Sequence, residues 1–411
     1  MSASTERMTH IVSVTPVPLH TDSRTLKQAL SFARLGYRST VIADGVRHDV
    51  TPDFRLPATR QTAAAAGAAR RGWQSLRAKA GLPWLGQAML FLAWLAATPG
   101  RRNLRLWRRL PAADLYVLHE FSQYPAIWLR RRLTGGALIY DAHDFYTGIE
   151  SAEMQSGFDR NWLFPFFRRL EAACIRASDA VLTVSDSLVT LLRDAYGAEA
   201  TVLRNAHDPS LDNVDAGGLK ERLGLDDSHV LIVTIGNHKP GQATETFLAA
   251  LQQLPAHVHV AFIGRGYESL QPQIARLGLE GRAHIPGAAA PGDIVPWART
   301  ADAAAVIYYA RSANYAGALP NGLFQSLGAA LPIFYPDLPE IRNLAERENF
   351  GICVDWASIP AIVASLDRFA GDTGLRQAER ERSRQAGTRL SWISEEEHLK
   401  NAILRVLANA G

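Results

Sequence analysis

Buried strands and amphipathic helices alternate along the first half of the chain. An apolar run at residues 11–15 predicts a buried strand, and the helical spacing of apolar residues over 24–35 predicts an amphipathic helix. A second apolar run at 39–43 predicts another strand. The pattern continues with predicted strands at 115–118, 137–140, 180–184 and 200–203 and predicted helices around 125–132 and 187–195. This order is typical of a parallel, doubly wound α/β sheet.

The alternation stops at residues 208–218, which have the Asp, Asn, Ser, Pro and Gly composition of a linker, and then restarts. Further strands are predicted at 230–235, 258–263, 303–308 and 333–335, with helices at 244–254, 321–330 and 395–407. We therefore predict two Rossmann-like domains, 1–207 and 208–390, and a C-terminal helix within 391–411 that packs back on the first domain. Ligands in such sheets bind outside the carboxyl ends of the strands, so we expect the site in a cleft between the domains.

A basic stretch without a single Asp or Glu extends from Phe54 to Ala113 and interrupts the first half as an insertion. Its centre, 84–97, is apolar and rich in Trp, but 14 residues are too few to cross a bilayer. Arginines and a lysine surround it, and we expect residues 70–109 to lie at an anionic membrane surface. A core helix beside a solvated basic helix remains the alternative. No recognition motif supports binding to nucleic acid.

The composition is that of a soluble globular protein of 411 residues, with a formal net charge of +4. Its two cysteines, Cys174 and Cys353, are far apart and lack metal-ligand spacing, which fits a reducing compartment. We expect both thiols to be buried. The N-terminal sequence lacks the apolar core of a signal peptide, so we expect a cytoplasmic protein.

The segment from Ser312 to Pro332 carries the most distinctive chemistry. Pro320 suits the first turn of a helix because its missing N–H would be unpaired there. The next N–H groups and the helix dipole make a site for an anion or a sugar hydroxyl, and Gln325, one turn further, could contact a ribose. The segment could equally be an ordinary core helix with Leu323 inward and Gln325 solvated.

This segment resembles the donor-site helix of family 4-like glycosyltransferases of the GT-B fold. Relatives usually continue the Pro-Asn pair with Lys-Leu-Phe-Glu, where this chain has Gly322, Leu323, Phe324 and Gln325, and they carry a further Glu at the position of Gly317. The resemblance implies that the donor is bound by Pro320, Asn321, Leu323 and Gln325. A neutral amide bonds a ribose hydroxyl less strongly than a carboxylate, by about 1 kcal/mol, so Gln325 should weaken donor binding without abolishing it.

Residues 140–144, Tyr-Asp-Ala-His-Asp, are similar to a strand-end motif of the same family, whose His faces the transferred sugar. The resemblance therefore implies a catalytic role for His143. His119 and Glu120 also end a predicted strand and are acceptor-side candidates, together with Asp144. Glu120 and Asp144 could supply an acidic partner for a histidine. Either histidine could instead be satisfied by backbone carbonyl groups.

The loop that follows the first strand of the second domain departs from the family pattern. Relatives carry Arg and Lys there for the donor diphosphate, whereas this chain has Gly236, Asn237 and Lys239, with Gln242 in place of the Arg. Gly236 lets the backbone turn close to a phosphate. Arg265 is a substitute source of positive charge or, equally, a solvated loop residue.

The resemblance implies metal-independent, retaining transfer of a sugar from a nucleotide-sugar to an acceptor hydroxyl, in the assembly of surface polysaccharide or lipid-linked glycan. No cofactor is expected, and no Asp-x-Asp metal motif is present in the sequence. The alternative is a catalytically degenerate GT-B protein that serves as a binding or scaffold partner of an active transferase. It is motivated by the departures at Gly317, Gly322, Gln325 and Gln242. The sequence does not indicate an oligomeric state.

Overall fold

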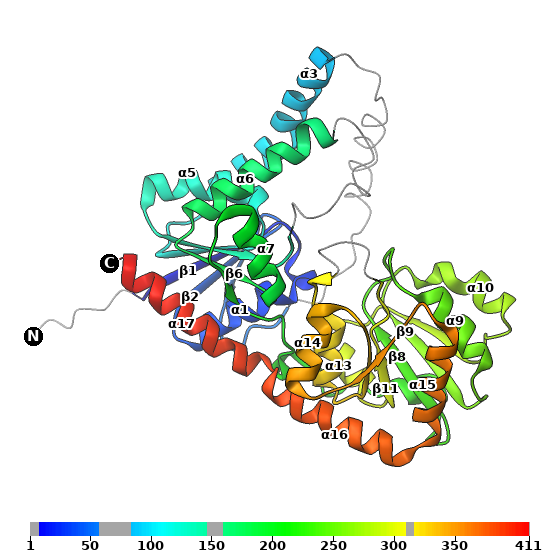
Figure 1. Ribbon diagram of the computed structural model, residues 1–411. Helices are drawn as coiled ribbons and strands as arrows, with labels where there is room; N and C mark the ends of the chain where they lie inside the picture. Colours follow the sequence, from blue (N-terminus) through cyan, green and yellow to red (C-terminus); the bar gives the residue numbers. More distant parts are fainter. Residues whose placement is uncertain (1–7, 57–83, 146–158, 310–315, 411) are drawn as a thin grey trace, which may run out of the picture. The chain divides into compact units, whose positions relative to one another are not determined.

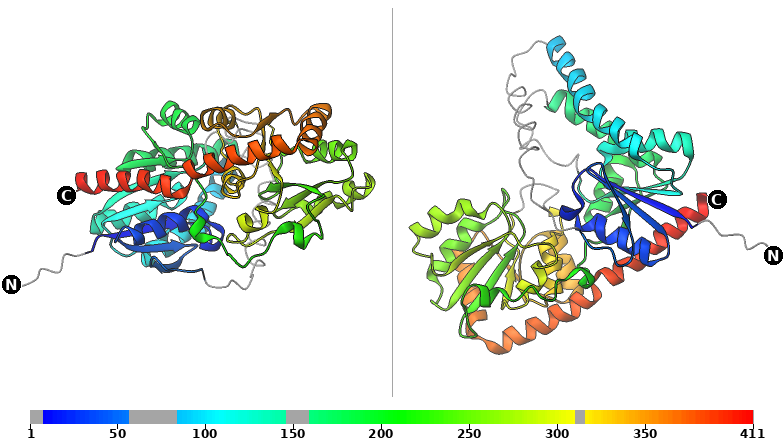
Figure 2. Two further views of the ribbon diagram at one scale, coloured as in Figure 1. Left: turned by 90° about the horizontal axis from the view of Figure 1, so that it is seen from below. Right: turned by 180° about the vertical axis from the view of Figure 1, so that it is seen from behind.

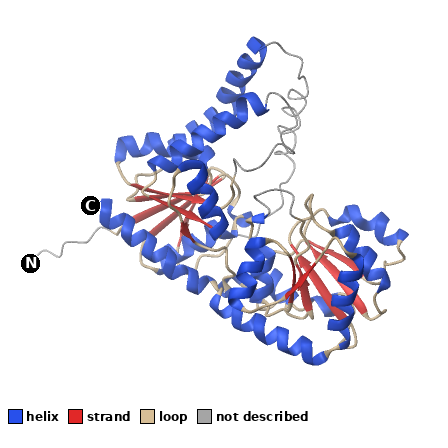
Figure 3. Cartoon of the chain, viewed as in Figure 1, coloured by secondary structure: helices blue, strands red, loops and turns tan. Residues whose placement is uncertain are grey.

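The computed structural model describes residues 8–56, 84–145, 159–309 and 316–410 (Figure 1). It divides into two compact units. The first contains Met1–Val184, Leu188–Leu203 and His398–Gly411, and the second contains Ser185–Ser187 and Arg204–Glu397. In each unit helices flank a sheet on both faces (Figure 3), so the predicted α/β class with two doubly wound sheets is confirmed.

The first sheet has seven strands in the order β3-β2-β1-β4-β5-β6-β7, and all neighbours are parallel except β2 and β3. The strands are β1 (His10–Thr15), β2 (Arg38–Ala43), β3 (Val46–Val50), β4 (Leu115–Leu118), β5 (Ala137–Ala142), β6 (Ala180–Thr183) and β7 (Thr201–Val202). The unit's helices are η1 (Leu19–Thr21), α1 (Ser23–Arg34), α3 (Trp84–Leu95), η2 (Ala96–Gly100), α4 (Arg101–Arg109), η3 (Phe121–Gln123), α5 (Tyr124–Thr134), η5 (Asp159–Leu163), α6 (Phe164–Ala177), most of α7 (Asp186–Tyr196) and the end of α17 (Trp392–Ala410).

Alternate residues of the central strands serve the two faces of this sheet. Tyr116 and Leu118 of β4 and Tyr140 of β5 are buried in the core that packs under α4, α5, α6 and α7. Asp141 of β5 points to the opposite face, where it contacts α1. Because side chains alternate between the two faces of a strand, β5 places Tyr140 in the hydrophobic core and Asp141 against α1.

Helix α4 corrects the prediction that residues 54–113 form an insertion. Leu106 and Leu110 are buried in the core of the first unit, so α4 belongs to the connection between β3 and β4 that covers the sheet. Asn103 accepts a hydrogen bond from the Ala126 amide and donates to the carbonyl of Ser122, which fixes α4 against α5. Residues 57–83 of the predicted insertion lie outside the described residues.

Helix α3 extends away from the sheet and packs on η5 and the start of α6 (Figures 1 and 2). The contact is aromatic: Phe91 and Trp94 of α3 pack against Trp162, Phe166 and Phe167. Among the described residues, no helix is both long enough and apolar enough to span a membrane.

The second sheet has six parallel strands in the order β10-β9-β8-β11-β12-β13. They are β8 (Val230–Ile235), β9 (Val258–Ile263), β10 (Ala283–Gly287), β11 (Ala303–Ala305), β12 (Ile333–Pro336) and β13 (Ile352–Val354). The helices are η6 (Pro209–Leu211), α8 (Leu219–Arg222), α9 (Thr244–Gln253), η7 (Tyr267–Leu270), α10 (Gln271–Arg276), α11 (Ile294–Ala298), α13 (Asn321–Gly328), α14 (Pro339–Glu348), α15 (Ile359–Gly371), α16 (Thr373–Arg389) and the first part of α17.

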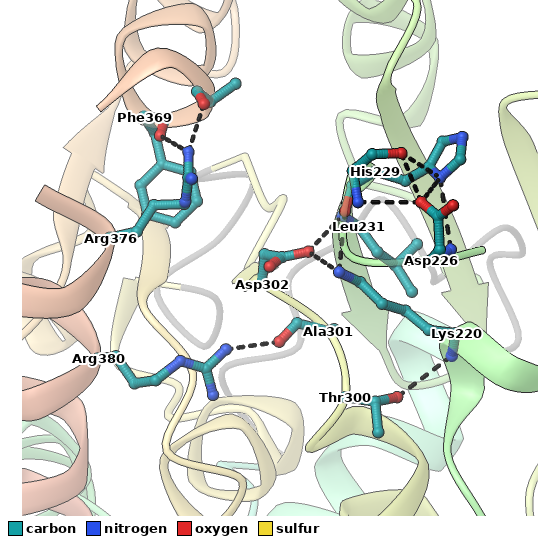
Figure 4. A network of polar contacts seen from close by, with 12 residues as sticks. Lys220, Asp226, His229, Leu231, Thr300, Ala301, Asp302, Phe369, Arg376 and Arg380 are labelled. Carbon is teal, nitrogen blue, oxygen red and sulfur yellow. Dashed lines mark hydrogen bonds and ion pairs between the residues drawn. The ribbon is translucent and has the colours of Figure 1, made fainter. Parts of the chain in front are cut away.

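A polar network secures the amino ends of these strands (Figure 4). The ammonium group of Lys220 lies 2.8 Å from a carboxylate oxygen of Asp302 and donates to the carbonyl of His229. The same Asp302 oxygen accepts a hydrogen bond from the Leu231 amide. Arg380 of α16 donates to the Ala301 carbonyl. These groups therefore tie α8 and α16 to the edge of the sheet opposite the carboxyl ends.

The two cysteines differ in environment. Cys174 is buried in the first unit, as predicted, and burial raises the pKa of its thiol well above the ordinary value. The prediction is wrong for Cys353, which is exposed. Cys353 lies on β13, the edge strand of the second sheet, and its neighbour Val354 takes the buried position.

Candidate functional site

Two loops meet at the carboxyl ends of β8 and β9. Gly236 adopts a φ of 125°, and a Cβ atom at Gly264 would lie 2.1 Å from the Gly236 carbonyl oxygen, so this close approach requires glycine. The His238 amide donates to the Arg265 carbonyl at 2.8 Å, and the Arg265 amide donates to Oδ1 of Asn237 at 3.0 Å. The loops are thus fixed to one another by one hydrogen bond between backbone groups and one from a backbone amide to the Asn237 side chain.

This pair of loops presents two positive charges. The side chains of Lys239 and Arg265 are exposed, and neither has a hydrogen-bond or ion-pair partner among the described residues. Both cations sit on loops at the edge where ligands of parallel sheets bind. The arrangement suits a diphosphate, whose charge the two side chains could balance.

The side chain of Gln242 is not available to bind a ligand as the Arg of relatives is, because its amide makes hydrogen bonds within the protein. It is 8% exposed, and its Oε1 accepts from the Lys239 amide at 3.2 Å and from the Tyr267 hydroxyl at 3.3 Å. Its Nε2 donates to the Asn237 carbonyl at 3.3 Å. Gln242 therefore shapes the loop that carries Lys239.

Helix α13 begins beside these loops. Pro320 is its N-cap and accepts a hydrogen bond from the Leu323 amide, while Asn321 is exposed and its Oδ1 accepts from Nδ2 of Asn205 at 2.7 Å. A Cβ atom at Gly322 would lie 2.3 Å from the Ile235 carbonyl oxygen. The start of α13 therefore packs directly on the end of β8, which a side chain at Gly322 would prevent.

A narrow pocket lies where α13 meets the sheet. Its walls include Gln242, Pro320, Gly322, Leu323 and Ser326. Leu323 is fully buried and belongs to the hydrophobic core, so only part of its surface reaches the pocket. Gln325 is half-buried on the helix, and its amide has no hydrogen-bond partner within the described ranges. Of the predicted donor residues, Pro320 and Leu323 line this pocket, and Gln325 is not among its walls.

The first unit holds a buried ion pair at the corresponding edge of its own sheet. Asp141 accepts from Nε and Nη2 of Arg24, each at 2.7 Å, and from Nε2 of Gln28 at 2.6 Å. Burial opposes ionisation of Asp141, but the charge and hydrogen bonds of Arg24 and His119 outweigh it and hold the pKa of this carboxyl far below its ordinary value. Asp141 is therefore a permanent anion inside the unit.

His119 is the second member of this cluster. It is 1% exposed, and its Nδ1 lies 3.1 Å from Oδ2 of Asp141, whereas its Nε2 has no hydrogen-bond partner in the described part of the chain. His119, Asp141 and half-buried His143 each place one ligand-type atom within 4.8 Å of the others. The set has the donor atoms of a metal site, but Arg24, Gln28 and His119 already engage the Asp141 oxygens. This set therefore fits a metal ion poorly.

Asp22 completes the cluster from the start of α1. Burial would raise its pKa, but the nearby charge of His119 and hydrogen bonds from Thr25 and Thr15 lower it. The same carboxylate caps α1 by accepting from the Thr25 amide at 3.0 Å. Two carboxylates and one guanidinium thus surround His119.

Glu120 and Asp144 were candidates for the acidic partner of a histidine. The structure places Asp141 beside His119, and Glu120 instead accepts from the Ser122 hydroxyl at 2.6 Å. Asp144 is exposed. The sequence analysis did not predict a role in the site for Asp141, Arg24 or Asp22. The available signal was a charged residue within the otherwise apolar strand 137–142.

The model of the "glycosyl transferase 4-like domain" family matches residues 22–206. No curated protein matches the chain.

Solved structures share the fold of the chain at low sequence identity. Sucrose-phosphate synthase from Thermosynechococcus elongatus is 13% identical, with a TM-score of 0.66 over 98% of this chain and 100% of that one. Anabaena HepE in complex with UDP and glucose is 16% identical, with a TM-score of 0.64 over 97% and 100%. WaaG, a glycosyltransferase involved in lipopolysaccharide biosynthesis, is 14% identical, with a TM-score of 0.61 over 95% and 98%. The chain therefore has the GT-B fold of these structures, and its residues 22–206 match the glycosyl transferase 4-like domain.

Proposed function

We propose that the protein transfers a sugar from a nucleoside-diphosphate sugar to an acceptor hydroxyl with retention of configuration. The observation that carries this proposal is the common location of Lys239, Arg265 and the amino end of α13. All three lie at the carboxyl edge of the second sheet. Cations and free helix N–H groups stabilise a diphosphate both as bound substrate and as leaving group.

Bound ligands in the similar structures support a nucleotide-sugar donor. HepE structures contain UDP with glucose, UDP alone, and UDP-glucose. These ligands make UDP-sugars the first donors to test with the present protein. The half-buried amide of Gln325 would accept the ribose hydroxyls more weakly than a carboxylate does.

The proposed reaction breaks the bond between the anomeric carbon and the phosphate oxygen and forms one from that carbon to the acceptor oxygen. The departing phosphate oxygen takes the acceptor proton on the same face of the sugar, so no separate base is needed. Lys239 and Arg265 would stabilise the charge that develops on this oxygen. We propose no metal ion or other cofactor.

On the first unit, we propose that His143 donates a hydrogen bond to the transferred sugar. Asp141 and Arg24 would act as positioning residues, because their buried ion pair anchors the end of β5 two residues before His143. We further propose a glycan or a lipid-linked sugar as acceptor, and a cytoplasmic protein attached peripherally to the membrane.

A panel of UDP-, GDP- and ADP-sugars tests this proposal through hydrolysis or transfer by purified, folded protein. We expect turnover with at least one donor. His143→Ala should then lower kcat about tenfold, the worth of one charge-assisted hydrogen bond. Folded protein that neither binds nor consumes any donor would contradict the proposal, and unchanged turnover of His143→Ala would remove that residue from the site.

A further inference from the structure

The helices on one face of the first sheet carry a concentrated positive charge. The arginines of α4, α5 and α6 are Arg101, Arg102, Arg105, Arg108, Arg109, Arg130, Arg131, Arg132, Arg168, Arg169 and Arg176. The three helices contain a single carboxylate, Glu171, which is buried and accepts hydrogen bonds from Tyr140 and Tyr196. These helices therefore expose cations without exposing an anion of their own.

Exposed apolar side chains lie on the same group of helices. They are Met89 and Leu92 of α3, Leu104 of α4, and Trp128, Leu129 and Leu133 of α5. Helix α3 has no charged residue, and the aromatic contacts of Phe91 and Trp94 fix it to α6, yet Met89 remains 70% exposed. Single exposed apolar residues are ordinary, but a group of them beside a basic surface indicates a binding surface.

A groove of about 510 Å³ runs between α5 and α6. Tyr124, Trp128, Arg132 and Arg176 line it. Arg132 lies over the Trp128 ring, with its guanidinium carbon 5.4 Å from the ring centre. Neither Arg132 nor Arg176 has a hydrogen-bond or ion-pair partner among the described residues, so both guanidinium groups are free to bind an anion.

Arg131, the third arginine of this groove, is occupied. It donates to the carbonyls of Gly136 and Ala177 and to a carboxylate oxygen of Asp179, at 2.8, 2.8 and 2.9 Å. This arginine also neutralises Asp179, which lies two residues after Ala177 of the groove. The charge available to a ligand is therefore that of Arg132 and Arg176.

We propose that the outer surface of α3 to α6 docks on an anionic phospholipid bilayer and that the groove between α5 and α6 holds a lipid phosphate. Guanidinium groups bind phosphate through paired hydrogen bonds, and the flanking Trp128 and Leu133 suit the boundary between headgroups and acyl chains. Nucleic acid would use the arginines but not the exposed aliphatic side chains. This site lies outside the sugar-transfer chemistry proposed above, and its test needs neither donor nor acceptor.

Vesicle flotation with the full chain tests the proposal. The vesicles contain phosphatidylcholine with or without phosphatidylglycerol. We expect binding only to the anionic vesicles, and Arg132→Gln with Arg176→Gln should weaken it about 30-fold, or about fivefold per arginine. The matched control is Arg276→Gln with Arg368→Gln, which removes the same charge from exposed positions of the second unit and should leave binding unchanged.

Leu133→Ser keeps the charge and should also weaken vesicle binding, which separates a bilayer from a soluble phosphate compound. Circular dichroism should show that each variant is folded, because none of these side chains makes a hydrogen bond or ion pair among the described residues. Three results would overturn the proposal: no binding of the wild-type chain to anionic vesicles, equal losses in the groove and control variants, or binding to duplex DNA without binding to vesicles.

Discussion

A Cβ atom at Gly322 would lie 2.3 Å from the carbonyl oxygen of Ile235, closer than side chains approach backbone atoms. Relatives carry Lys at this position, and the sequence alone suggests a lost charge. The structure shows a different reason for glycine: the first turn of α13 packs directly on the last residue of β8. Helix α13 therefore packs on β8 more closely than a side chain at position 322 would allow.

Gly322→Lys should not restore a family-like site. We expect it to lower the free energy of unfolding by about 1–3 kcal/mol, the usual cost of forcing extra atoms into a packed position. Gly371→Ala is the matched control, because nothing lies within 4 Å of a Cβ atom there and its stability should not fall. Chemical denaturation measures both. An equally stable Gly322→Lys variant with higher turnover would show that the close contact is not a constraint.

Gln325→Glu should strengthen donor binding, because a carboxylate accepts ribose hydroxyls in charge-assisted bonds. A gain of about 1 kcal/mol corresponds to a Kd about fivefold lower. Gln325→Ala should weaken binding instead, since the half-buried amide has no competing partner in the described structure. Titration of the preferred nucleotide-sugar measures both constants. If neither substitution changes Kd, Gln325 does not contact the donor.

Asp141→Asn should be strongly destabilising, because it leaves the guanidinium of Arg24 buried without its counter-charge. We expect a loss of about 3–5 kcal/mol at neutral pH. Glu381→Gln makes the same chemical change in an exposed, solvent-screened pair with Arg384 and should leave stability nearly unchanged.

The pH dependence gives a second test of the Asp141 pair. The folded-state pKa of Asp141 is lowered, so its stabilisation is complete above the unfolded-state pKa, near 3.9, and decreases as the pH falls below it. The difference in stability between wild type and Asp141→Asn should therefore narrow in acid. A difference that stays constant to pH 2 would contradict a charged Asp141.

His259 should make the second unit sensitive to mild acid. Burial and the neighbouring His284 and His229 lower its pKa to about 4, and its Nδ1 lies 3.1 Å from Nε2 of His284. The unfolded chain binds this proton near pH 6.5 and the folded chain only near pH 4, so stability should fall as the pH decreases through this interval.

His259→Gln should reduce the dependence of the free energy of unfolding on pH in this interval. His257→Gln, at an exposed position, should change that dependence less. Urea unfolding at several pH values provides the measurement. If the free energy of unfolding depends on pH equally in the wild type and in His259→Gln, the acid sensitivity does not come from His259.

The central parallel strands could be predicted from the sequence because both of their faces are buried. The predicted bounds of β4, β8 and β9 agree with the structure. The edge strand β3 was missed, since Val46–Val50 is mostly polar and exposed and its pairing with β2 depends on tertiary structure. The core positions of Leu106 and Leu110 were missed, because α4 is rich in arginine.

The candidate site was predictable only in part. Lys239 follows a predicted strand, and Pro320 marks the start of a predicted helix. Both positions can be assigned to the edge of the sheet from the sequence around them. The ion pair of Arg24 and Asp141 joins residues 117 positions apart, which no local pattern can reveal. The internal hydrogen bonds of Gln242 likewise depend on the folded loop.

Isothermal titration calorimetry with UDP-, GDP- and ADP-sugars tests most directly whether the second unit still binds an activated sugar. We expect saturable binding of at least one compound to the wild-type chain and a Kd at least tenfold higher for Lys239→Ala with Arg265→Ala, because two diphosphate contacts are lost. The absence of binding heat for every compound, or an unchanged Kd in the double variant, would contradict the proposed site.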